Sequence, residues 1–213
     1  MPISYPIHLN LSNRLCVVVG GGAVAERKVL GLLEAGGRVR VVSPALSPKL
    51  TQLELAGEIE TIVSAYHSSY IQEAFLVFAA TNLPEVNAQI ALDAKALNLL
   101  VNSADSPDAG DFVTPSVLRR GELCLSVTTG GGSPMLSSRI SAELATRYGV
   151  EYGAYIELLG RFRVSIKTSI KEAPHRKAAL AAILTRETEL LALLREGKTE
   201  EADRMAESVL NQF

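Results

Sequence analysis

The sequence predicts an α/β protein: a Rossmann-type, doubly wound parallel sheet, followed by a small α+β region and a helical C-terminal domain. Three observations predict it. Apolar strand-like segments alternate with helix-like segments from residue 14 to 101, a glycine-rich turn joins the first strand to the first helix, and helical periodicity dominates beyond residue 149. Fully apolar strands that alternate with helices are typical of right-handed βαβ units, whose parallel sheet is covered on both faces.

The first part of the chain supplies the elements of the sheet. Short apolar runs rich in Val and Ile predict buried strands, and longer segments with helical spacing predict the helices between them. In chain order we expect a strand at 15–20, a helix at 23–34, a strand at 38–43, a helix around 47–57, strands at 59–63 and 74–82, a helix at 84–96 and a strand at 97–105.

The pattern changes after residue 105. Turn residues surround two strand-like runs, DFVTP at 111–115 and ELCLSVTT at 122–129, which predict a hairpin or an extension of the sheet. A helix of about 13 residues follows from Met135, with Gly149 as its stop signal. We therefore expect three parts, with bounds 1–113, 114–148 and 149–213.

Helices dominate the last of these parts. The segment at 176–197 reads as an amphipathic helix that Gly197 ends, and a short last helix follows it. Its apolar stripe comprises Leu180, Ile183, Leu184, Leu191 and Leu194.

Composition narrows the class of protein. With 47% hydrophobic and 21% charged residues, the 213-residue chain is expected to be globular and soluble. Its apolar runs are interrupted before the roughly 20 residues that cross a bilayer, so we expect no membrane association. A net charge of -2 and only 5% aromatic residues argue against nucleic acid as a partner. Cys16 and Cys124 lie far apart in apolar runs, which indicates reduced core thiols in a cytoplasmic protein.

The turn after the first strand carries a nucleotide-binding pattern. Gly20, Gly22 and Ala25 match G-x-G-x-x-A, between a strand and a helix. In this motif the first glycine permits the turn, the second lets a pyrophosphate approach the backbone, and the small third residue lets the helix pack on the strand. The phosphate then lies at the helix N-terminus, where free amides and the helix dipole favour negative charge. Dinucleotide binding is favoured over a merely structural turn.

Two further strand ends are candidates for cofactor contacts. The second strand ends in Ser43 and Pro44, where an acidic residue that binds the ribose of NAD would normally stand. Ser43 therefore either contacts the ribose or opens a Ser-Pro turn, while Arg38 and Arg40 lie far back for a 2'-phosphate. Thr81 and Asn82 end the fourth strand, and they either line the cofactor cleft or simply precede the next helix.

Several segments together resemble one family, the siroheme synthase dehydrogenase/chelatase module: precorrin-2 dehydrogenases with or without sirohydrochlorin ferrochelatase activity. They are YPIHLNLSNRLCVVVGGGAVAERK at 5–28, AATN at 79–82, VNSADSPDAGDFVTPSVLRRGEL at 101–123 and SVTTGGGSPMLSSRISAEL at 126–144. The resemblance covers about the first 150 residues closely and the rest loosely.

The resemblance implies an NAD-dependent oxidation of precorrin-2 to sirohydrochlorin by a homodimer whose central region, 114–148, exchanges strands and helices. It further implies ferrous iron as a second substrate in bifunctional members. Asp105 is then the catalytic acid/base residue, although the D-S-P sequence alone favours an Asx turn. The positions expected to contact the dinucleotide are Gly22, Ala23, Val24, Ser43 and Pro44.

A second glycine-rich turn, TTGGGSP at 128–134, precedes the helix from Met135. Its backbone amides suit either the carboxylates of a tetrapyrrole or a purely structural role at the dimer interface. The candidate substrate-binding residues here are Thr129, Gly130, Gly131 and Ser133. Some relatives carry a phosphorylated serine where this chain has Thr129, so that modification is not expected.

The sequence offers no metal-ligand spacing among its histidines, so no protein-bound metal is predicted. A different class of function also fits the βαβ pattern: a non-catalytic nucleotide-sensing module that regulates a partner protein. That alternative leaves the segments DSPDAGDFVTPS and TTGGGSP without a role.

Overall fold

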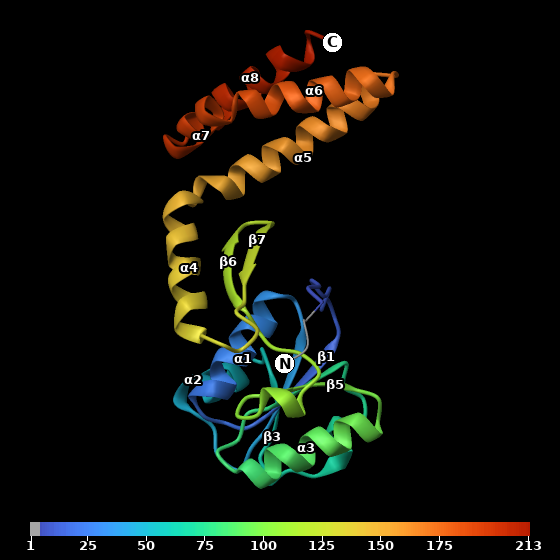
Figure 1. Cartoon of the computed structure of the whole chain (residues 1–213), viewed down its shortest axis with the longest axis vertical. Coiled ribbons are helices and arrows are strands. Elements are labelled where there is room, and N and C mark those ends of the chain that lie inside the picture. Colours follow the sequence, from blue (N-terminus) through green and yellow to red (C-terminus); the bar gives the residue numbers. More distant parts are fainter. Residues whose placement is uncertain (1–4) are drawn as a thin grey trace. The chain divides into compact units, whose positions relative to one another are not determined.

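The computed structural model describes residues 5–213, which form two compact units with their boundary between Thr114 and Pro115 (Figure 1). The boundary lies beside the predicted division after residue 113. The further division of the second unit into a dimerisation region and a helical domain stays a prediction.

The first unit contains a five-stranded, wholly parallel sheet. Its strands are β1 (Leu15–Val19), β2 (Arg38–Val42), β3 (Glu60–Ile62), β4 (Leu76–Ala79) and β5 (Leu100–Ser103). Their spatial order is β3-β2-β1-β4-β5, with every neighbouring pair parallel. The chain thus builds the sheet outward from β1 in two directions, which confirms the predicted doubly wound fold.

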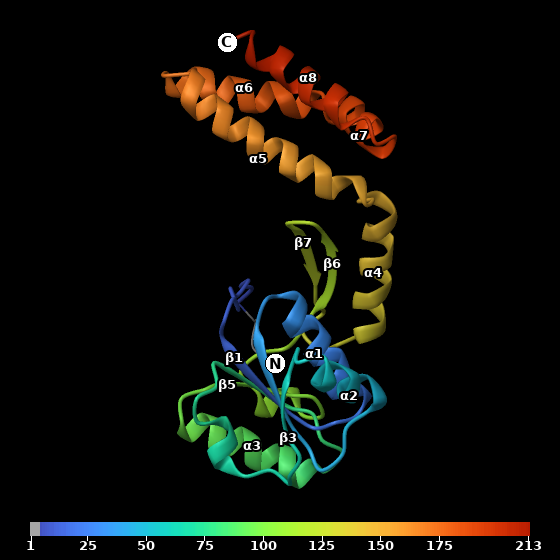
Figure 2. The same ribbon diagram turned by 180° about the vertical axis from the view of Figure 1, so that it is seen from behind.

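Helices cover both faces of this sheet. On one face α1 (Ala23–Glu34) and α2 (Pro48–Leu55) share a core with the side chains of Val18, Val41 and Phe78. On the other, α3 (Pro84–Ala96) and the short η1 (Ser68–Ile71) pack on alternate residues of the same strands, while η2 (Pro107–Ala109) follows β5. Figures 1 and 2 show the helices on the two sides of the sheet. All five residues of β1 are buried, as a central strand requires.

The second unit begins with an antiparallel hairpin of β6 (Ser116–Arg120) and β7 (Leu123–Val127). The helices α4 (Pro134–Arg147), α5 (Glu151–Ser169), α6 (Ala173–Thr185), α7 (Glu187–Arg195) and α8 (Thr199–Leu210) follow. The last four share one apolar core, in which Leu158, Ile166, Ile183 and Leu190 are each at most 1% exposed. Figure 2 shows α5 beside α6 in this layer.

The first strand of the hairpin differs from the prediction. The segment 111–115 forms no strand, and the strand is 116–120 instead. Asp111 explains why. Its amide donates to the carbonyl of Val101 at 2.7 Å, and its carboxylate accepts from the amide of Val101 at 3.0 Å. These bonds tie the segment to the edge of β5, so the paired hairpin strand begins only after Pro115.

The prediction of a single helix at 176–197 is wrong. The segment forms the end of α6 and all of α7, which meet at Arg186, and the φ of -95° and ψ of 9° of that residue lie outside the helical region. The bend lets residues on both sides reach one core, since Ile183 and Leu190 are both almost fully buried. Two members of the predicted stripe, Leu180 and Leu184, are 36% and 54% exposed, because α6 turns its face with Ala179 and Ile183 toward the core.

None of the helices within residues 5–213 has the length and apolar character needed to cross a lipid bilayer.

Candidate functional site

The carboxyl edge of the sheet in the first unit holds the candidate cofactor site. The chain turns one way after β1 and the other way after β4, and these two strands are neighbours. Open α/β sheets bind ligands at such a switch point, because the loops separate there and leave a crevice. The loops after β1, β2, β4 and β5, with the first turn of α1, contain nine of the thirteen predicted site residues.

Gly20 begins the turn after β1 and tolerates no side chain. Its φ is +131°, and a Cβ built there would lie 2.2 Å from the carbonyl oxygen of Ala80, at the end of β4. Its amide donates to the carbonyl of Val42 at 2.9 Å, which joins the turn to β2 as well. Gly20 therefore allows three strand ends to approach one another closely.

Gly22, in contrast to Gly20, faces open space. A Cβ there would meet no atom within 4 Å, and its φ of -91° is open to any residue. It is the N-cap of α1, and no side chain caps the first amides of that helix. A phosphate is the kind of group that uncapped amides at a helix N-terminus bind. The turn thus fits the pyrophosphate of a dinucleotide.

The first residues of α1 also suit a bound pyrophosphate at this turn. Ala23 and Val24 are exposed on the first turn of α1, whereas Ala25 is fully buried against the sheet. Small size at Ala25 lets the helix lie close to β1. Ala23 and Val24 are accordingly free to contact a ligand at the same turn.

The hydroxyl of Ser43, which follows β2, is engaged within its own turn. It donates to the carbonyl of Ala45 at 2.7 Å and accepts from the Ala45 amide at 3.4 Å, and Ser43 is only 7% exposed. The adjoining Pro44 is exposed. Of the two roles considered for Ser43, the geometry favours the Ser-Pro turn, with Pro44 as the surface that it presents.

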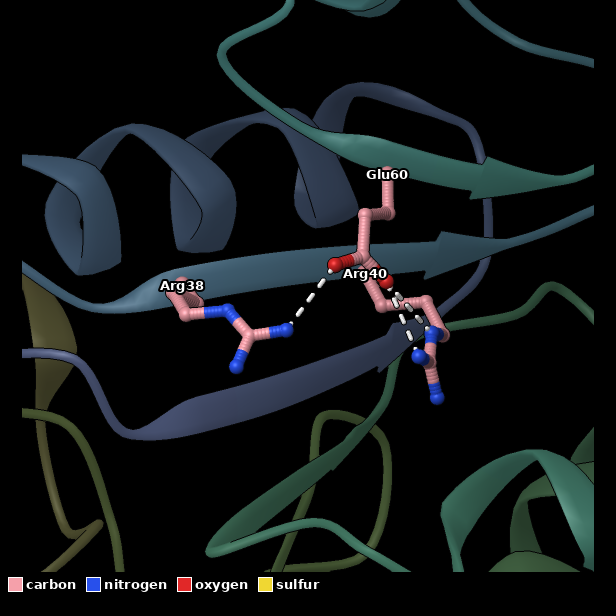
Figure 3. Close-up of polar contacts among 3 residues, drawn as sticks. All are labelled: Arg38, Arg40 and Glu60. Atoms are coloured by element: carbon pink, nitrogen blue, oxygen red, sulfur yellow. Dashed lines mark hydrogen bonds and ion pairs between the residues drawn. The ribbon is translucent and has the colours of Figure 1, made fainter.

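Both arginines of β2 are paired with Glu60 of β3 (Figure 3). Arg38 donates to one carboxylate oxygen at 3.1 Å, and Arg40 donates to the other through Nη2 at 2.9 Å and Nε at 3.1 Å. The hydrogen bonds from Arg38 and Arg40 hold the pKa of Glu60 below its usual value. Both arginines thus pair across β2 and the outer strand β3, and they lie before the carboxyl end of β2, where a 2'-phosphate would bind.

Thr81, after β4, makes its contacts with the next helix. Its amide and hydroxyl donate to Oδ1 of Asn87 at 3.1 and 2.7 Å, and the hydroxyl accepts from the amide of Leu83 at 3.1 Å. Asn82 is exposed, and the N-cap of α3 is Leu83. Thr81 thus shapes the loop, while Asn82 is the residue that the loop presents to solvent.

Asp105 lies exposed just beyond β5, at the same edge. The hydroxyl of Ser103 donates to its Oδ1 at 2.8 Å, and the Ala104 amide donates to the carbonyl of Ala79 at 3.0 Å, which joins this loop to β4. Partial burial by itself raises the pKa of Asp105. Hydrogen bonds from Asn87, Ser103 and the amides of Asp105 and Ser106 outweigh that effect, so the pKa is lowered. Asp105 is an ionised carboxylate at neutral pH.

Sequence reasoning missed Asn87, whose side chain makes three hydrogen bonds with Thr81 in the loop after β4. It is 1% exposed and belongs to the buried stripe of α3 with Ile90, Ala91 and Ala94. A polar residue at an apolar position of a helix was the available signal.

Lys28 was also missed. It stands on the sheet-facing side of α1, where its Nζ donates to the Thr114 hydroxyl at 2.5 Å and lies 5.8 Å from the ring centroid of Phe78. Burial, with a smaller effect of Arg27, lowers the pKa of Lys28 to about 8.

The second glycine-rich turn belongs to the second unit. The hydroxyl of Ser133 accepts from the Leu136 amide at 3.2 Å and so caps α4, and the hydroxyl of Thr129 accepts from the Ser133 amide at 2.9 Å. Gly130 and Gly131 both have positive φ and are exposed. The side chains thus stabilise the turn, and the glycines present its backbone to solvent.

The chain matches a known protein family and is similar to several known proteins. A family described as "Putative NAD(P)-binding" matches residues 7–116, and its description confirms the prediction of NAD as the cofactor. The chain is 36% identical over 172 residues to a siroheme synthase of Methylobacillus flagellatus, covering 81% of this chain and 37% of that protein. It is 34% identical over 207 residues to a siroheme synthase of Psychromonas ingrahamii, covering 97% and 44%.

The chain therefore spans about two fifths of the length of these curated relatives. Among solved structures, it is similar to "SirC, precorrin-2 dehydrogenase", with a TM-score of 0.74 and 28% identity. That match covers 96% of this chain and 100% of the other.

Proposed function

The chain belongs to this NAD(P)-binding family, and from that premise we propose that it oxidises precorrin-2 to sirohydrochlorin with NAD in siroheme biosynthesis. The observation that carries the proposal is the position of an ionised carboxylate, Asp105, at the same sheet edge as the open glycine turn at Gly22. The names of the relatives support the same reaction: siroheme synthases, and a precorrin-2 dehydrogenase whose structure the whole chain resembles.

The first unit would hold the cofactor at the N-terminus of α1. The amides that follow Gly22 bind the pyrophosphate, and Ala23 and Val24 contact it on the exposed first turn. Pro44, Ser43 and the loop of Thr81 and Asn82 border the same edge. The position of Arg38 and Arg40 before the carboxyl end of β2, where both pair with Glu60, favours NAD over NADP.

The reaction removes a hydride and a proton from the tetrapyrrole. When bound, NAD supplies the acceptor for the hydride. The carboxylate of Asp105 accepts the proton from the substrate's carbon or nitrogen, as a general base. Its lowered pKa keeps it in the ionised form that this step requires, and the Ser103 hydroxyl fixes one of its oxygens.

The same carboxylate suits a second reaction. Insertion of ferrous iron into sirohydrochlorin releases pyrrole N–H protons, which Asp105 can accept. We therefore include iron as a substrate and siroheme as the product of that step. In the second unit, the exposed backbone of Gly130 and Gly131, set by Thr129 and Ser133, is the proposed contact for tetrapyrrole carboxylates.

We further propose that the protein is a homodimer through 114–148 and acts in the cytoplasm. Within the described residues, Ser137 is the one buried member of α4, at 6% exposure. Met135 and Leu136 of the same helix are 84% and 36% exposed, and Val117 of β6 is 45% exposed. Apolar residues on a poorly covered helix and hairpin are typical of an association surface. The free thiols Cys16 and Cys124 suit a reducing compartment. Light scattering that gives the mass of a monomer at micromolar concentration would contradict the dimer.

The test of the reaction is anaerobic absorbance spectroscopy of the purified protein with precorrin-2 and NAD. We expect NADH and the sirohydrochlorin spectrum to appear together, and Asp105→Asn to slow both by roughly a hundredfold or more while NAD binding persists. Ferrous iron is then added, and a spectral change faster than the enzyme-free control supports iron insertion. Absence of NADH would overturn the proposal. The non-catalytic alternative is not favoured, because the matched relatives are enzymes by name.

A further inference from the structure

The loop after β2 is joined to the glycine turn. The amide of Ser47 donates to the carbonyl of Gly21 at 2.8 Å. A Cβ on Gly21 would lie 1.9 Å from the carbonyl oxygen of Ala45 and 2.6 Å from the hydroxyl oxygen of Ser43, so the two segments are in close contact. In a dinucleotide-binding fold the pyrophosphate lies at the N-terminus of the first helix, and the ribose lies beside the end of the second strand. This loop therefore borders the adenosine ribose of a dinucleotide bound at the turn.

Glu26, on the first turn of α1, contributes a carboxylate to this loop. The hydroxyl of Ser47 donates to its Oε2 at 2.7 Å. Ser47 is also the N-cap of α2, and its hydroxyl accepts from the amide of Leu50 at 3.3 Å. The carboxylate of Glu26 thus lies at the N-terminus of α2, where free amides and the helix dipole attract an anion.

The N-terminus of α2 is also the part of this loop that would attract the extra phosphate of NADP, which is carried on the 2' oxygen of the ribose. Lys49, exposed on the first turn of α2, adds a positive charge there. An acidic residue at the end of the second strand normally selects NAD, but Ser43 stands at that position. A carboxylate already held beside Ser47 places a like charge next to any 2'-phosphate.

We propose that Glu26 is the residue that discriminates against NADP: its carboxylate repels a 2'-phosphate in the loop after β2 and leaves a 2'-hydroxyl unopposed. The inference rests on the proposed function, in which NAD binds at the turn of Gly22. It assigns to the first helix the selection that an acidic residue at the end of the second strand makes in other dinucleotide-binding folds.

Two substitutions separate the charge of Glu26 from its structural contacts. Glu26→Gln removes the charge but keeps an oxygen that accepts from the Ser47 hydroxyl, so the loop and the cap of α2 are retained. Glutamine is also a good helix former. The matched control is Glu58→Gln, which removes the same charge from an exposed residue just before β3, at the opposite, amino edge of the parallel sheet.

Isothermal titration calorimetry of the full chain, at low and at high salt, measures the Kd for NAD and the Kd for NADP. We expect the ratio of the Kd for NADP to the Kd for NAD to fall at least about fivefold in Glu26→Gln at low salt, because a phosphate monoester carries nearly two negative charges. High salt should reduce this difference from the unmodified protein, since it screens the charges. In Glu58→Gln the ratio should stay unchanged.

An unchanged ratio in the folded Glu26→Gln variant overturns the proposal, and so does an equal fall in Glu58→Gln. Equal changes in the affinity for both dinucleotides would indicate a structural role of Glu26 and would overturn it as well. Unmodified protein that binds NADP as tightly as NAD has no discrimination to explain, which is a further contrary result.

Oxidation of precorrin-2 is measured separately from these affinities. A protein that shows the expected ratios but forms no NADH from precorrin-2 supports the role of Glu26 and overturns the proposed reaction. A protein that oxidises precorrin-2 with an unchanged ratio in Glu26→Gln has the opposite meaning. The two failures are thus distinguishable.

Discussion

Gly20 and Gly22, two residues apart in one motif, are expected to respond in opposite ways to the same substitution. At Gly20, a φ of +131° and a Cβ 2.2 Å from the Ala80 carbonyl oxygen leave no room for alanine. The backbone strain costs an L-residue of order 1–3 kcal/mol. Overpacking adds typically about 1–3 kcal/mol. We therefore expect Gly20→Ala to lower the free energy of unfolding of the first unit by about 2–6 kcal/mol.

At Gly22 the added methyl group meets no atom within 4 Å, and the backbone is in an ordinary conformation. The free energy of unfolding should change by less than about 1 kcal/mol, because alanine caps a helix less well but also restricts the unfolded chain. The methyl group instead occupies the space proposed for the pyrophosphate. We expect the Kd for NAD to rise at least about tenfold, which is about 1.4 kcal/mol.

Urea unfolding, with hydrogen exchange of the β1 and β4 amides to report on the first unit, measures the stability of both variants. Isothermal titration calorimetry measures NAD binding. The reasoning would be refuted if Gly22→Ala destabilised the first unit as much as Gly20→Ala does, or if it bound NAD as tightly as the unmodified protein.

Three further outcomes follow from the ionisable groups. The pKa of Lys28 is lowered to about 8 in the folded protein from its ordinary 10.5, so the unfolded chain binds more protons between these two values. The free energy of unfolding should therefore rise with pH in that window. Urea unfolding at a series of pH values should show the rise in the unmodified protein and not in Lys28→Met. The pKa of Glu60 is lowered from its ordinary 4.5, so its pairing with Arg38 and Arg40 stabilises the fold above pH 4.5, and this stabilisation is lost as the pH falls through the folded pKa. Because the Glu60 side chain is 49% exposed, Glu60→Gln should lower the free energy of unfolding by at most about 1 kcal/mol. Thermal unfolding should show this difference at low salt and not at high salt. Burial raises the pKa of the Cys16 thiol to about 11, so little reactive thiolate forms at neutral pH. In the Cys124→Ser variant, a thiol reagent at neutral pH should therefore label Cys16 only after urea unfolding. Rapid labelling of the native protein would contradict the burial of Cys16.

Much of the sheet unit could be predicted, because its signals are local. The helices at 23–34 and 84–96 have the predicted bounds, since each is marked by a glycine or proline start and by helical spacing of apolar residues. The strand at 111–115 could not be excluded in this way. The bonds of Asp111 to Val101 that occupy that segment depend on an element ten residues earlier in the chain.

The candidate site was predicted less completely. The glycine turn follows from sequence, but the role of Ser43 stayed open until its hydroxyl was located on Ala45. Asn87 escaped notice because the pattern reports only that its helix position is buried, and not that the polar groups of Thr81 meet it there. The assignment of Asp105 came from resemblance, and its role stays a prediction.

The sequence by itself determined the order of strands and helices in the first unit and the turn that suits a dinucleotide, because backbone conformation and burial depend on neighbours within a few residues. Tertiary structure alone decided which polar groups meet. Arg38 and Arg40 are held by Glu60 because the parallel pairing of β2 and β3 brings side chains 20 to 22 positions apart into contact. Asn87 of α3 meets Thr81, six positions earlier, because the chain turns between β4 and that helix. Hydrogen bonding depends on distance in space, and a pattern along the chain carries little information about it.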